Sequence, residues 1–139
     1  AQGGMAAQIA VIQNELFDLG ADLSRPNMAE DDALPYPVLR MIQGQVDRLE
    51  AEIDAMNAQM EPLRSFILPG GSALSAHLHL SRTVARRAER CVTALATTDA
   101  VNPAALRYLN RPSDWLFVAA RHANLDAGGD ILWVPGASR

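Results

Sequence analysis

The residues best suited to chemistry are the arginines between positions 82 and 90, because three of them recur at intervals of four. An α-helix advances by about 100° per residue, so one polar face of a helix would carry all of the following: Ser75, His79, Arg82, Arg86, Glu89 and Arg90. Guanidinium groups bind phosphate and carboxylate through paired, charge-assisted hydrogen bonds. This face therefore predicts an anchor for a polyanion such as a triphosphate. The residues alone also fit a solvated basic face that forms salt bridges between subunits.

The opposite face of the same helix is apolar. It consists of Leu80, Val84, Ala88, Cys91 and Leu95, and an apolar stripe of this kind is typical of a helix face that packs on the core. We therefore expect Cys91 to be an unreactive core residue.

A second polar stripe follows in the last helix that the sequence predicts. Its members recur at intervals of three and four residues: Arg107, Asn110, Asp114, Phe117 and Arg121. Asn110 and Asp114 would lie one turn apart, where they could hold an arginine or a ligand hydroxyl. The other interpretation is a polar exterior with helical ion pairs, although the aromatic ring of Phe117 favours a buried interface.

Several catalytic motifs are missing from the sequence. It contains no phosphate-binding GxxxxGK[ST] loop and no glycine-rich dinucleotide fingerprint. His77 and His79 would point to different faces of a helix, and the sequence has only His122 and Cys91 besides. A metal site built from protein side chains is therefore not predicted.

Charge is divided unevenly along the 139 residues, whose net charge is −4. Residues 1–63 contain 11 acidic side chains and 3 arginines, whereas residues 64–139 contain 5 acidic side chains and 9 arginines. The second half can thus attract an anion, but an acidic chain is a poor general nucleic-acid binder. A single cysteine and the lack of a long apolar run favour a cytoplasmic or organellar protein that does not cross a membrane.

Hydrophobic periodicity and breaker residues predict four helices, over residues 5–19, 38–63, 73–96 and 103–124. Gly20 would end the first helix, Ser72 would cap the third, and Pro103 would begin the fourth. An apolar tail at residues 131–135 would pack back on a helix or on a neighbouring subunit. Short connections favour an all-α, antiparallel helical bundle, and we expect a single domain over residues 1–139.

Three blocks of sequence, taken in order, resemble the PduO-type ATP:cob(I)alamin adenosyltransferases. The first is IQNELFDLGADL at residues 12–23, the second joins FILPGG at 66–71 to RTVARRAER at 82–90, and the third is RYLNRPSDWLF at 107–117. An LExxID element at residues 49–54 also fits. The resemblance runs from about residue 8 to residue 134.

This resemblance implies a homotrimer of five-helix bundles with active sites at the subunit interfaces. The implied reaction transfers the 5′-deoxyadenosyl group from ATP, accompanied by Mg²⁺, to cob(I)alamin and releases triphosphate. A reductase and an adenosylcobalamin-dependent acceptor enzyme are the implied partners. Cob(I)alamin is itself the nucleophile, so such a protein needs no general base and supplies positioning and charge stabilisation.

The resemblance also implies which residues hold ATP. Arg82 and Arg86 would contact its phosphates, and Glu89 and Arg90 would complete that cluster. Asn110 would contact the nucleotide.

On the corrinoid side, the resemblance implies three residues. Phe66 would displace the lower axial ligand of cobalamin, Phe117 would contact the corrinoid, and Asp114 would support the arginines or help to arrange the corrinoid. An aromatic wedge that excludes water and the base leaves a four-coordinate cobalt, which is easier to reduce.

One part of the family pattern has no match in this sequence. The family opens with an ATP loop rich in Thr, Gly and Asp that carries a lysine, followed by a first bundle helix, whereas this sequence begins at what would be the second helix. We expect the protein to carry both ahead of residue 1, since a bundle without one helix would expose a large apolar groove.

Two other hypotheses compete with the enzyme. The first is a corrinoid-binding carrier or sensor bundle without ATP turnover, which would not need Arg82, Arg86, Glu89 and Asn110 together. The second is a purely structural helical oligomer, which would leave the turn at residues 66–71 unexplained.

Overall fold

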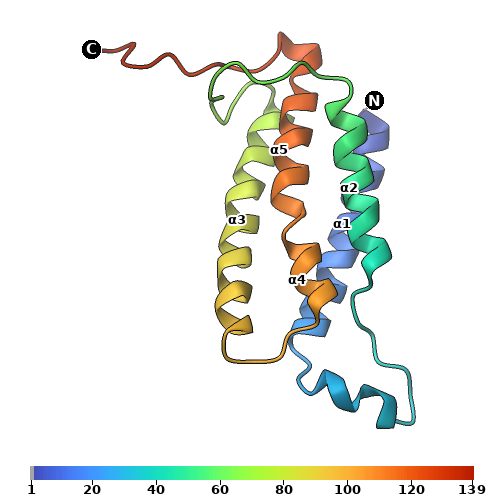
Figure 1. Ribbon diagram of the computed structural model, residues 1–139. Coiled ribbons are helices and arrows are strands. Elements are labelled where there is room, and N and C mark those ends of the chain that lie inside the picture. The colour runs from blue at the N-terminus through green and yellow to red at the C-terminus, as the bar shows by residue number, and fades with distance from the viewer. Residues whose placement is uncertain (1) are drawn as a thin grey trace.

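The structure, a computed structural model, describes residues 2–139. This part of the chain contains five α-helices and two short 3-10 helices. The α-helices are α1 (Gln2–Leu23), α2 (Gln43–Asn57), α3 (Ala73–Ala96), α4 (Pro103–Leu109) and α5 (Pro112–Ala123), and the 3-10 helices are η1 (Met28–Ala33) and η2 (Leu125–Ala127). The chain runs down α1, up α2, down α3 and up through α4 and α5, and α5 lies between α2 and α3 (Figure 1). The predicted all-α antiparallel bundle is confirmed. Residue 1 of the predicted domain lies outside the described residues.

No helix within residues 2–139 combines the length and the apolar character that a membrane crossing requires.

Helix α1 places two carboxylates in the core among apolar side chains. Its buried face consists of Met5, Ile12, Glu15, Leu19 and Asp22, which recur at the spacing of one helix face. The prediction that Gly20 ends this helix is wrong, because α1 continues to Leu23. A glycine inside a helix costs about 1 kcal/mol, and the buried contacts of the flanking Leu19 and Asp22 outweigh that cost.

The carboxylate of Asp22 joins the end of α1 to the segment before α2 and to the start of α4. It is 1% exposed and accepts hydrogen bonds from the Met41 amide at 2.7 Å, the Asn102 side chain at 2.8 Å and the Arg40 guanidinium at 3.0 Å. A buried carboxylate is tolerated only when it is paired and hydrogen-bonded. These partners therefore determine where the three segments meet.

Arg40 explains why α2 begins later than predicted. Its guanidinium also binds both carboxylate oxygens of Asp31, at 2.7 and 3.0 Å, and this hydrogen bonding holds the pKa of Asp31 below its usual value. Residues 38–42 are extended to make these contacts. The helix consequently runs over Gln43–Asn57 rather than over the predicted residues 38–63.

Glu15 is the second buried carboxylate, and it links α1 to α2 and α4. The Arg48 guanidinium binds both of its oxygens, and the Tyr108 hydroxyl donates to it at 3.0 Å. Arg48 also contacts Glu52, which in turn accepts a hydrogen bond from the Trp115 indole of α5 at 3.2 Å. Burial, followed by the neighbouring carboxylate, raises the pKa of Tyr108 well above its usual value.

Helix α3 spans Ala73–Ala96, as predicted, and Ser72 caps it by accepting a hydrogen bond from the Ser75 amide at 3.1 Å. Its orientation is the reverse of the predicted one. The first half of the polar face turns toward α5, so that Ser75 is fully buried and His79 is 6% exposed, whereas Arg86 and Arg90 in the second half are exposed.

The apolar face of α3 points outward within this chain. Leu80 and Val84 are each 64% exposed, and Cys91, which we expected in the core, is exposed. The core contacts of α3 come instead from Leu78 and Val92, which flank the polar face. The sequence correctly separates the two faces of this helix, but the neighbouring helices decide which one is buried.

The predicted helix over residues 103–124 is two helices in the structure. Pro103 begins α4, as predicted, and Pro112 begins α5. Proline has no amide hydrogen and its ring displaces the carbonyl four residues earlier. The chain therefore breaks at residues 110–111, and the polar stripe that we predicted along one continuous helix is divided between α4 and α5.

A side chain at the end of α5 fixes the turn that precedes α3. The Asn124 side chain accepts a hydrogen bond from the Ser72 amide at 2.9 Å and donates one to the Gly70 carbonyl at 2.9 Å. Gly71 has a φ of 110°, and a Cβ atom on it would lie 2.2 Å from the Asn124 Oδ1 atom. Only glycine allows the backbone to approach Asn124 this closely.

We therefore expect Gly71→Ala to lower the free energy of unfolding by about 2–4 kcal/mol, because alanine is strained at this φ and collides with Asn124. Gly20→Ala is the matched control. Its Cβ would meet nothing within 4 Å, so it should raise stability by about 0.5–1 kcal/mol. Urea unfolding monitored by circular dichroism measures both, and a Gly71→Ala protein as stable as the parent would contradict this account.

Candidate active site

Phe117 of α5 is the centre of a cluster of aromatic and basic groups between α3 and α5. The Arg82 guanidinium lies over its ring, with the guanidinium carbon 4.9 Å from the ring centroid. The His79 imidazole meets the same ring edge-on, at 6.3 Å between centroids. A cation over an aromatic face is stabilised by the ring quadrupole. Phe117 thus holds Arg82 in a defined place while leaving its hydrogen-bond donors available.

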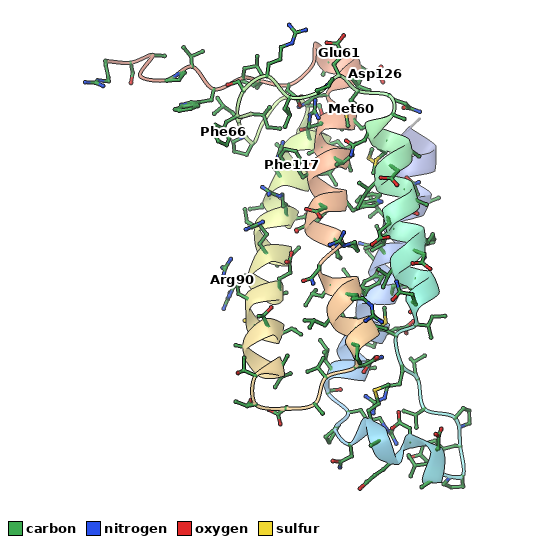
Figure 2. The ribbon with its side chains drawn as sticks, in the orientation of Figure 1. Met60, Glu61, Phe66, Arg90, Phe117 and Asp126 are labelled. Atoms are coloured by element: carbon green, nitrogen blue, oxygen red, sulfur yellow. The ribbon has the colours of Figure 1, made fainter. Side chains whose placement is uncertain are left out.

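This cluster forms one wall of a pocket, which we call the aromatic pocket. Its volume is about 590 Å³, and its lining consists of Leu63, Ser65, Phe66, Ile67, Arg82 and Phe117. The loop between α2 and α3 supplies the first four of these residues. Figure 2 shows Phe66 and Phe117 at the same end of the bundle. The structure therefore brings together three residues that the sequence assigned to binding from distant positions.

Several polar atoms in and near the cluster are buried without a hydrogen-bond partner within residues 2–139. They are His79 Nε2, Arg82 Nε, Glu89 Oε1 and Asp130 Oδ1. Leaving a buried polar group unpaired costs about 1–3 kcal/mol, and native proteins keep few such groups. Three of these four atoms lie on the polar face of α3, which is consistent with a surface prepared for a ligand.

Burial lowers the pKa of His79 below its usual value, and the charge of the nearby Arg82 lowers it further, while Asp130 opposes both. His79 is therefore neutral at physiological pH. A neutral imidazole places no second positive charge beside the Arg82 guanidinium.

A second hollow, which we call the basic groove, lies further along α3. It has a volume of about 370 Å³ and is lined by Arg86, Glu89, Arg90, Thr93, Ala94 and Thr97. Figure 2 shows Arg90 on the lower half of α3, pointing away from α5. None of the ion pairs formed within residues 2–139 involves Arg82, Arg86 or Arg90. Three guanidinium groups in a row thus keep their capacity to bind an anion.

The structure does not bring the remaining two predicted residues into either hollow. Asn110 is partly buried where α4 ends, and Asp114 is exposed in the first turn of α5. The break before Pro112 separates them from the regular spacing on which their prediction rested.

The sequence did not reveal how the aromatic pocket is supported. Arg121 of α5 donates hydrogen bonds to Asp130 at 2.9 Å and to the Glu61 carbonyl at 2.9 Å. It thereby holds both the loop that carries Phe66 and the start of the C-terminal tail. The sequence signals for this arrangement were the place of Arg121 in the second polar stripe and the apolar character of the tail.

The described residues contain no group of three or more His, Cys, Asp or Glu side chains placed to hold a metal ion. Mg²⁺ commonly binds through substrate phosphates, water and only one or two carboxylates. The residues present thus fit Mg²⁺ as a companion of a phosphate ligand, with Glu89 as the one carboxylate among the residues that line the basic groove.

Comparison with known proteins identifies the family of this chain. The sequence profile of the family described as cobalamin adenosyltransferase matches residues 1–123. The chain is 52% identical over 130 residues to the corrinoid adenosyltransferase of Mycobacterium tuberculosis, covering 92% of this chain and 65% of that protein. It is 42% identical over 128 residues to the corrinoid adenosyltransferase of Bacillus subtilis, covering 91% and 63%. The chain thus spans somewhat less than two thirds of the length of these relatives.

The fold is also similar to that of a solved relative. A variant of the PduO-type ATP:corrinoid adenosyltransferase of Lactobacillus reuteri, in complex with cobalamin and ATP, superimposes with a TM-score of 0.81 at 35% identity. The match covers 93% of this chain and 70% of that one. The family profile, the sequence relatives and the solved structure agree, and this chain therefore belongs to the cobalamin adenosyltransferase family.

Proposed function

We propose that the protein containing this chain transfers the 5′-deoxyadenosyl group from ATP to cob(I)alamin. The observation that carries the proposal is the aromatic pocket beside a row of unpaired arginines, in a chain that belongs to this family. Corrinoid adenosyltransferases at 52% identity, and a structural relative that holds cobalamin and ATP, support the same activity.

The reaction needs a nucleophile, an electrophilic carbon and a leaving group in line. The electron pair of cob(I)alamin attacks the ribose C5′ atom, so a cobalt–carbon bond forms and cobalt becomes formally Co(III). The bond between C5′ and the phosphate oxygen breaks, and its electron pair leaves with triphosphate. No proton has to move at the reacting atoms, which explains why a site without a general base can suffice.

The arginines of α3 are placed to stabilise the leaving triphosphate. Arg86 and Arg90 line the basic groove, and Arg82, one helical turn before Arg86, lines the aromatic pocket. Guanidinium groups that are already in place stabilise charge as it develops on the leaving oxygen. Glu89 would limit the mutual repulsion of the arginines before ATP arrives.

The aromatic pocket is suited to an apolar macrocycle. Phe66 and Phe117 provide two aromatic surfaces, and the neighbouring Leu63 and Ile67 add apolar lining. We assign Phe66 to the lower face of the corrinoid, where a bulky ring would exclude the lower axial ligand. Asn110 and Asp114 would act on ligands held between subunits rather than within one chain.

A homotrimer with active sites between subunits is part of the proposal. Its support is the outward apolar face of α3, on which Leu80 and Val84 are both largely exposed. Apolar residues grouped on one exposed face are typical of an interface. A cytoplasmic location, a reductase that supplies cob(I)alamin and an acceptor enzyme for the product complete the proposed setting.

Arg86→Ala should lower the rate of adenosylcobalamin formation by about a hundredfold or more, because one fixed donor to the leaving group is lost. The trimer should stay intact. The assay mixes the whole protein with ATP, Mg²⁺ and chemically reduced cob(I)alamin in the dark and follows absorbance, and sedimentation reports the oligomer. Arg64→Ala is the matched control, since Arg64 is exposed and pairs only with Glu61. Full activity in Arg86→Ala would remove Arg86 from the site.

Stability should fall as the pH is lowered from 7.5 to 5.5, partly because of His79. Its pKa is lowered in the folded protein, so between the folded and unfolded pKa values the unfolded chain binds more protons. The greater proton binding of the unfolded chain lowers the free energy of unfolding as the pH drops below about 6.5, the ordinary pKa of histidine. The pH dependence of urea unfolding should be weaker in His79→Gln than in His77→Gln, which removes an exposed histidine of the same helix. Equal pH dependence in the two variants would contradict this role of burial.

A further inference from the structure

The C-terminal tail pairs with the loop that carries Phe66. Ile67 and Leu132 form an antiparallel bridge. The Leu68 amide donates to the Ile131 carbonyl at 2.8 Å, and the Trp133 amide donates to the Phe66 carbonyl at 2.8 Å. The loop and the tail therefore form a short two-stranded ribbon at one end of the bundle, beyond the ends of α3 and α5 (Figure 1).

The register of this ribbon puts two aromatic rings directly opposite each other. With Ile67 opposite Leu132, Phe66 pairs with Trp133 on the same face of the ribbon. Their rings are in edge-to-face contact, with centroids 5.8 Å apart and an angle of 64° between the planes. Phe66 also lines the aromatic pocket, whereas Trp133 does not. Trp133 thus contacts Phe66 from outside the pocket.

Phe66 has little other support within the chain. Its side chain is 76% exposed, and the loop on which it lies has no regular secondary structure apart from this pairing. A two-stranded ribbon is only marginally stable by itself. A cross-strand aromatic pair contributes about 0.2–1 kcal/mol, which is a large share of the stability of so small an element.

Arg121 anchors both strands of the ribbon to the helical core. Arg121 of α5 forms an ion pair with Asp130 at 2.9 Å, just before the tail, and donates to the Glu61 carbonyl at 2.9 Å, before the loop. Both groups of the ion pair are largely buried. Arg121 therefore aligns the two strands, and Trp133 sets the position of the Phe66 ring at their far end.

We infer that Trp133 is a positioning residue that holds Phe66 against the lower face of the corrinoid. The inference rests on the proposed adenosyltransferase function and adds a residue that does not itself line the pocket. Displacing the lower ligand requires the Phe66 ring to occupy a fixed place beneath cobalt. A ring on a free loop would spend much of its time elsewhere, and the ligand or water would return.

The test measures four-coordinate cob(II)alamin in the whole protein by electron paramagnetic resonance, with ATP present and no reductant. Trp133→Ala should reduce the four-coordinate fraction of bound cob(II)alamin by about tenfold or more, since small misplacements of positioning groups have large effects. Trp133→Phe should restore most of it because a ring is again available to contact Phe66. Val134→Ala is the matched control, since Val134 is 63% exposed on the same tail.

A second variant and a second assay separate the inference from a general loss of structure. Asp130→Ala frees the start of the tail and should reduce the four-coordinate fraction in the same direction. Adenosylation of chemically prepared cob(I)alamin, which has no lower ligand to displace, should fall much less than that fraction in Trp133→Ala. ATP binding should not change.

The outcomes are distinguishable. If the parent protein does not adenosylate cob(I)alamin, the proposed function fails. If the parent is active and Trp133→Ala has the same four-coordinate fraction as Val134→Ala, the positioning role fails and the function stands. Weaker cobalamin binding with an unchanged four-coordinate fraction, or an equal loss of activity with cob(I)alamin, would likewise overturn the positioning role.

Discussion

The orientation of α3 is the constraint on which the rest of the molecule depends. Turning its polar face toward α5 buries Ser75 and His79 and lays Arg82 over Phe117. The same orientation leaves Leu80 and Val84 exposed on the surface of the chain. A chain that buries hydrogen-bonding side chains such as Ser75 and His79 and exposes apolar ones such as Leu80 and Val84 loses stability as a monomer, because burial of polar groups is costly and burial of apolar groups is favourable. Under the proposed function, ligand binding on one face and subunit contact on the other would offset this loss.

Two buried carboxylates hold the frame in which α3 takes this orientation. Asp22 joins α1 to α4 through Asn102, and Glu15 joins α1 to α2 and α4 through Arg48 and Tyr108. Each network fixes the relative orientation of the helices as well as the contact between them, since hydrogen bonds to a buried carboxylate tolerate little displacement. Apolar packing alone would leave the helices of such a bundle free to shift along one another. The polar anchors therefore give a small core the rigidity that a binding site between helices requires.

The two hollows of the candidate site lie at different positions along α3. In the proposed reaction the aromatic pocket would receive the corrinoid against Phe66 and Phe117, while the basic groove would hold the triphosphate near Arg86. Arg82 lines the aromatic pocket, and its guanidinium lies over the Phe117 ring. This arrangement suits a reaction in which the substrate is the nucleophile, because the protein then contributes geometry, dryness and positive charge. The ribbon of loop and tail would likewise contribute geometry, because it would position the Phe66 ring without touching the reacting atoms.

The sequence by itself determined the fold class, the limits of α3, its cap at Ser72 and the segregation of arginines on one of its faces. These features depend on local periodicity and on capping, and both are determined by residues that are close together in the sequence. Local pattern did not determine which face of α3 is buried, that Gly20 lies inside a helix, or that residues 38–42 are extended. It also missed the break at Pro112, although proline is a local signal that could have revealed it. Only the tertiary structure decided the rest, because the pairing of Asp22 with Asn102 and of Phe66 with Trp133 joins residues that are far apart in the chain. Periodicity along one segment carries no information about which distant segment supplies the partner.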